Sequence, residues 1–176
     1  MNLGELLEQK IFLGQEFLTW LWFLQESEGG AEVKDLGWVE LTLGERLVLG
    51  PAMGADGSRV TVSGAEGSLA EAREALRQGK LVDALRLGLE IHGEEYALNL
   101  EAAELALKGL KLPTTASPGE DPDGLEGLVL ERVALLENAV KAVEGLLGLF
   151  LTQRLHPEEG PELRRALGAW AGQEAG

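Results

Sequence analysis

The sequence lacks the residues that most catalytic sites depend on. It has no cysteine, which excludes disulfide bonds, thiolate metal ligands and a cysteine nucleophile, and this absence also favours a reducing cytosol. Its two histidines, His92 and His156, lie far apart in sequence, one on a predicted hairpin strand and one at a predicted helix end. No serine lies in a nucleophile-elbow motif, so no catalytic triad emerges. We predict that the chain is not an enzyme; a hydrolase is the least favoured interpretation.

Cofactor motifs are missing as well. Glycine is frequent, at 24 residues, but the sequence contains neither a dinucleotide-binding Gly-x-Gly-x-x-Gly nor a phosphate-binding P-loop. The segment Asp121-Pro-Asp-Gly124 only faintly resembles a calcium loop, and a turn followed by a helix cap explains it better. We therefore expect no metal and no cofactor.

Long hydrophobic runs are also absent. The strongest run, Phe17 to Leu24, is far shorter than the roughly 20 residues that cross a bilayer. Acidic residues stand near the N-terminus, between Met1 and Lys10, where a signal peptide has its basic region. We predict a cytoplasmic chain with no membrane contact.

Positive charge is scarce. The chain has 15 Lys and Arg against 30 Asp and Glu, a net charge of −15, the opposite of the usual nucleic-acid-binding composition. Four cations nevertheless recur close together, on one side of a predicted helix and on the strand after it: Arg73, Arg77, Lys80 and Arg86. They are candidate phosphate contacts; the alternative is an ordinary solvated face on which Glu71 and Glu74 provide ion-pair partners.

An apolar segment over residues 16–26 predicts a helix that is buried on more than one side. Its aromatic side chains have two candidate roles. The helix is either the central core helix or, as the alternative, a dimer surface, whose tentative interface residues are Phe17, Trp20, Trp22 and Phe23.

The rest of the chain alternates between strand and helix patterns. Period-two patterning predicts one three-strand set at 39–43, 46–49 and 60–62, and a second at 85–91, 96–100 and 105–112. A capping box at Ser68 and Glu71 predicts a helix over 69–78, and a loop over 113–124 precedes a long amphipathic helix over 125–155. The fold class is therefore α+β with antiparallel strands, organised as a domain over 1–155 and a short helical tail over 156–176.

Three stretches, taken in order, resemble a known family. They are FLGQEFLTWLWF at 12–23, EAREALRQGKLV at 71–82 and LKGLKLP at 107–113. Together they are similar to the C-terminal half of the recombination-associated protein RdgC family, over about residues 12–155. The resemblance implies a non-enzymatic protein of the kind that forms a two-chain ring around double-stranded DNA, with little sequence preference, and restrains a recombinase.

Two functional hypotheses follow. The first is a non-catalytic recombination or replication accessory protein, nucleoid-associated if it contacts DNA, and dimeric through the aromatic helix or the long C-terminal helix. A homo-oligomer, or a partner chain replacing the family's N-terminal half, would then complete the assembly. The second is an acidic, DNA-mimic-like interaction module that binds a basic DNA-handling protein, and it is motivated by the net charge.

Overall fold

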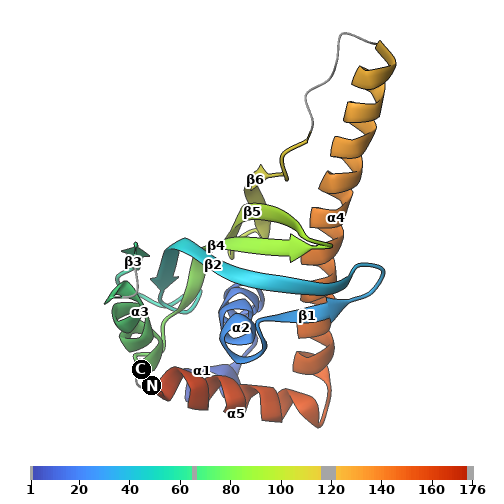
Figure 1. Cartoon of the computed structure of the whole chain (residues 1–176). Helices are drawn as coiled ribbons and strands as arrows, with labels where there is room; N and C mark the ends of the chain where they lie inside the picture. The colour runs from blue at the N-terminus through green and yellow to red at the C-terminus, as the bar shows by residue number, and fades with distance from the viewer. Residues whose placement is uncertain (1, 65–66, 116–121, 174–176) are drawn as a thin grey trace.

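A computed structural model of the chain describes residues 2–64, 67–115 and 122–173. These residues form helices around one antiparallel sheet, in the strand order β1-β2-β4-β5-β6, with β3 pairing beside β1 on the same edge of β2 (Figure 1). The strands are β1 (Gly30–Val33), β2 (Gly37–Gly50), β3 (Val60–Ser63), β4 (Leu81–Ile91), β5 (Glu94–Glu101) and β6 (Ala106–Lys111). The helices are α1 (Leu3–Gln9), α2 (Leu13–Glu28), α3 (Gly67–Arg77), α4 (Pro122–Leu155) and α5 (Glu159–Gly172).

The antiparallel α+β class predicted from the sequence is confirmed, but the strands form one sheet rather than two three-strand sets. The strands predicted at 39–43 and 46–49 are both part of the continuous strand β2, which includes Gly44 and Glu45 and whose register against β4 shifts between Leu43 and Leu47. Gly44 makes room for a neighbour, because a Cβ there would lie 2.7 Å from the side chain of Arg86. The glycine thus permits close strand pairing rather than a chain reversal.

Helix α2 is the central core helix. Phe17, Trp20 and Trp22 are each at most 2% exposed. The rings of Phe17 and Trp20 lie 5.8 Å and 5.6 Å from the ring of Phe150 in α4. The predicted dimer surface is therefore wrong for these three residues, because the sheet, α4 and α5 surround α2 within one chain. Phe23 is partly buried and also packs inward, against Trp170 of α5.

The predicted C-terminal tail belongs to the same core. Helix α5 contacts α1, α3 and α4, and its apolar residues Leu163, Leu167 and Trp170 join the core cluster. Residues 159–172 are therefore not an appendage to a 1–155 domain. None of the helices in the described ranges has the combination of length and hydropathy that a membrane span requires.

The long amphipathic helix predicted for 125–155 is confirmed as α4, which begins at Pro122. Its second half packs on the body through Ala139, Ala142, Leu146 and Phe150, whereas its first half projects beyond the sheet (Figure 1). The helix predicted over 69–78 is α3, although the side chain of its expected cap, Ser68, lies outside the described residues.

A buried ion pair joins α4 to α2. Nε of Arg154 lies 2.6 Å from Oε1 of Glu16, and the two side chains are 5% and 0% exposed. The second carboxylate oxygen of Glu16 accepts a hydrogen bond from the backbone N–H of Phe12, and Arg154 also donates to the carbonyl of Leu7. The pair thus links α4 to both helices of the N-terminal region.

Candidate functional site

Arg73 is a structural residue rather than the predicted phosphate contact. It is only 9% exposed, and its guanidinium carbon lies 5.4 Å and 4.6 Å from the ring centroids of Trp22 and Trp170. The guanidinium forms an ion pair with Glu26 and donates to the carbonyl of Trp170. These contacts hold α3 against α2 and α5, so Arg73 is not available to a nucleic acid.

The other predicted DNA contacts lie in separate places. Arg77 donates to Glu74 and to the carbonyl of Gln173, and Lys80 donates to the carbonyl of Ser58 at 2.6 Å. Arg86 lies on the open face of the sheet instead. The four cations therefore do not form the single phosphate-binding face that the sequence suggested.

Arg77 does lie in a cationic group that sequence reasoning missed. Together with Arg164 and Arg165 of α5, it lines a cavity of about 350 Å³ that also borders Glu8. The packing of α5 beside α1 and α3 brings these arginines together, and no local sequence pattern signals that contact.

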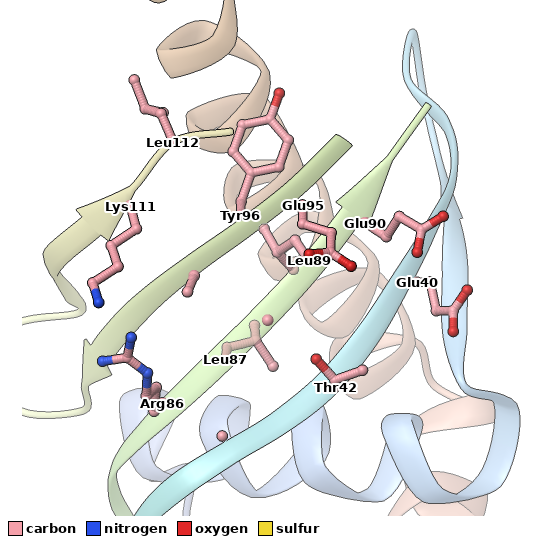
Figure 2. A pocket seen from close by; sticks show the side chains of 13 residues that line it. Glu40, Thr42, Arg86, Leu87, Leu89, Glu90, Glu95, Tyr96, Lys111 and Leu112 are labelled. Atoms are coloured by element: carbon pink, nitrogen blue, oxygen red, sulfur yellow. The ribbon is translucent and has the colours of Figure 1, made fainter. Parts of the chain in front are cut away.

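The open face of the sheet carries a hollow of about 400 Å³ (Figure 2). Its floor is made of small residues on neighbouring strands, because Gly88 pairs with both Thr42 and Ala97. Figure 2 shows cationic side chains at one end, Arg86 and Lys111. A residue with a Cβ at position 88 would collide with Thr42, so the hollow depends on this glycine.

An acidic row borders the other end of the hollow. It consists of Glu40, Glu90 and Glu95, which are direct neighbours because Glu40 pairs with Glu90 and Glu90 pairs with Glu95. Like charges in directly opposed positions destabilise a sheet. Among the described residues, none of the three carboxylates forms an ion pair within 4.0 Å. The row therefore costs stability and leaves its negative charge open to a cationic partner.

No metal explains this row. Within residues 2–64, 67–115 and 122–173, no group of three or more His, Asp or Glu side chains is arranged to hold a metal ion. The weak calcium-loop candidate includes Asp121, which lies outside the described residues.

Tyr96 lies on β5 beneath this face and is 3% exposed. Its buried hydroxyl lies near the side chain of Asn138 in α4 and makes no hydrogen bond within the described residues. Burial raises the pKa of Tyr96 above its ordinary 10.0, Asn138 opposes the shift in part, and the Glu94 carboxylate adds to it.

We expect the phenol of Tyr96 to titrate above pH 10 in the folded protein. Its contribution to stability should be fully present below the unfolded pKa of about 10 and should be lost as pH rises through the folded value, because the unfolded state ionises first. Since Tyr96 is the one tyrosine in the sequence, ultraviolet absorbance of tyrosinate reports it alone. Tyr96→Phe should abolish the signal, and a midpoint at or below that of free tyrosine would contradict the burial argument.

Comparison with known proteins adds no assignment. Neither the models of known protein families nor the curated protein sequences contain a match to this chain.

Proposed function

We propose that the chain is a non-catalytic accessory protein of DNA recombination that binds a recombinase, or a similarly basic DNA-handling protein, through the acidic row. The observation that carries this proposal is the row itself: three glutamates lie on directly paired positions, and none of them has a cationic partner within the described part of the chain. The resemblance of residues 12–155 to the RdgC family supports the choice of a recombinase as the partner.

The overall charge supports the same choice. With a net charge of −15, the chain repels nucleic acid at long range and attracts the basic surface that a DNA-binding protein presents to its ligand. An acidic face of this kind can occupy the phosphate-binding surface of a partner.

The test is a triple substitution, Glu40→Gln, Glu90→Gln and Glu95→Gln. Glutamine keeps the shape and removes the repulsion, so the folded state should lose no stability, while binding to a purified filament-forming recombinase at physiological salt should weaken at least about tenfold. Titration calorimetry or a labelled-protein assay measures the dissociation constant. It is measured for the free recombinase and for the recombinase bound to single-stranded DNA.

A matched control makes the same change in net charge elsewhere. Glu71, Glu131 and Glu158 are exposed, and their replacement by glutamine should leave binding within about threefold of the parent. Equal weakening in both triple variants would reduce the effect to net charge and overturn the acidic row as the site. Absence of recombinase binding by the unaltered chain would overturn the proposal as a whole.

One observation favours direct DNA contact as a second candidate function. Arg77, Arg164 and Arg165 line the cavity where α1, α3 and α5 meet, so a phosphate group has a point of attachment there. The same preparation distinguishes the two: retention of duplex DNA at about 50 mM salt that Arg164→Glu and Arg165→Glu abolish would support this candidate. Loss of DNA binding with recombinase binding intact would separate the two activities.

A further inference from the structure

The projecting half of α4 exposes more large apolar side chains than any other part of the described chain. Six of them lie between residues 125 and 140, and each is at least 39% exposed: Leu125, Val129, Leu130, Val133, Leu136 and Val140. A helix that leaves such a surface in water marks an interaction site. The helix also contains Gly124 and Gly127, which weaken an isolated helix by about 1 kcal/mol each relative to alanine, so a packed partner would stabilise it.

The spacing of these side chains is that of a coiled coil. Val129, Val133, Leu136 and Val140 are separated by four, three and four residues, which places them at successive d, a, d and a positions of a heptad. We call these four residues the seam. The side chains that pack on the body, Ala139 and Ala142 among them, lie on a different side of the helix. The seam is thus free to meet a second helix while α4 stays attached to the sheet.

We propose that the seam binds the seam of a second copy of this chain, in a parallel, in-register two-stranded coiled coil. Valine at both a positions and leucine at a d position is the pattern that favours two parallel strands. This inference is independent of the proposed recombinase binding, because the acidic row lies on the sheet and contributes nothing to the seam.

The residues beside the seam determine the partner and its direction. In a parallel pair each g position faces the e position five residues later in the other copy. Arg132 at g would then face Glu137 of the other copy, so a cation meets an anion. Within the described residues, neither Arg132 nor Glu137 has an ion pair inside its own chain.

An antiparallel pair matches less well. It would place e positions of the two copies against each other and likewise g positions, so Glu137 would face Leu130 and Arg132 would face Ala139. That arrangement lacks the pairing of Arg132 with Glu137 that the parallel one makes. The complementarity of this short segment with itself is therefore specific to one direction and one register.

The first experiment is the association state of the full chain by sedimentation equilibrium. We expect a dimer whose dissociation constant rises at least about a hundredfold in Val133→Lys, since a lysine would be buried at the seam of each copy. Val133 is 47% exposed in the single chain, so the monomeric variant should unfold at the same temperature as the monomeric parent chain. Leu155→Lys, at 61% exposure on the same helix but off the seam, is the control and should dimerise as the parent does.

A second experiment tests register and direction. Because the chain has no cysteine, Val133→Cys introduces a single thiol that meets its own copy in the parallel coiled coil and forms a disulfide-linked dimer under mild oxidation. Leu155→Cys should not. Arg132→Glu should weaken the dimer about tenfold, and adding Glu137→Arg should restore it. A monomeric parent chain would overturn the proposal, whereas a dimer that shows neither the cross-link in Val133→Cys nor the charge rescue would overturn the parallel register.

Discussion

Replacing Glu16 with alanine should lower the free energy of unfolding by about 3–5 kcal/mol, among the largest effects of any single substitution in this chain. The substitution leaves the Arg154 guanidinium buried without its counter-ion, because that side chain is only 5% exposed. It also removes the acceptor for the backbone N–H of Phe12. Chemical denaturation followed by tryptophan fluorescence measures the loss.

The double variant Glu16→Leu with Arg154→Met is the informative control. Replacing both charges with apolar side chains removes the uncompensated ion, so most of the lost stability should return. If Glu16→Ala and the double variant were equally unstable, the loss would come from packing at α2 and not from the isolated charge. A loss below about 1 kcal/mol would mean that water reaches Arg154.

Replacing Trp22 with alanine should cost about 3–5 kcal/mol and leave any self-association unchanged. The indole is fully buried, meets Trp170 edge-on at 5.1 Å between ring centroids and donates from Nε1 to Glu26. Glu26 also accepts from Trp170 and pairs with Arg73, so the substitution opens a cavity beside a shared polar group. Thermal unfolding and sedimentation equilibrium together separate stability from assembly.

Trp38 provides the matched control for this prediction. It is 50% exposed on β2, and Trp38→Ala should change stability by no more than about 0.5 kcal/mol. Dimer loss in Trp22→Ala at temperatures where the monomer stays folded would reinstate the aromatic helix as an interface. Equal destabilisation by the two tryptophan variants would contradict the burial of Trp22.

Local patterns predicted the elements of this fold well. The alternation over 85–91 and 96–100 predicts the hairpin of β4 and β5, and the helical spacing after residue 125 predicts α4. Those signals arise from neighbours in the chain, where the side-chain period and the burial pattern coincide. β1 was missed because its four residues follow Gly29 without an alternating pattern, and their pairing with β2 supplies the missing signal.

The candidate site depended on long-range contacts and was predicted less well. Arg73 resembles a solvent-exposed cation in a local window, yet its partners Glu26 and Trp170 come from helices distant in sequence. The acidic row likewise arises from the registers of three strands, and each glutamate taken alone is one acidic residue among many. Abundant carboxylates become informative only when the sheet places them opposite one another.

The contact between α1 and α5 determines when these helices can pack during synthesis of the chain. α1 packs on α5, and Gly4 and Gly168 come so close that a Cβ on Gly168 would lie 3.1 Å from the backbone of Gly4. During synthesis, α1 therefore lacks its main packing partner until residues 159–172 leave the ribosome. Arg154, the counter-ion of Glu16, also follows late in the sequence, so the complete core can form only after residues 154–172 have been synthesised. Until then the apolar surface of α2 stays exposed, and a chaperone can bind it.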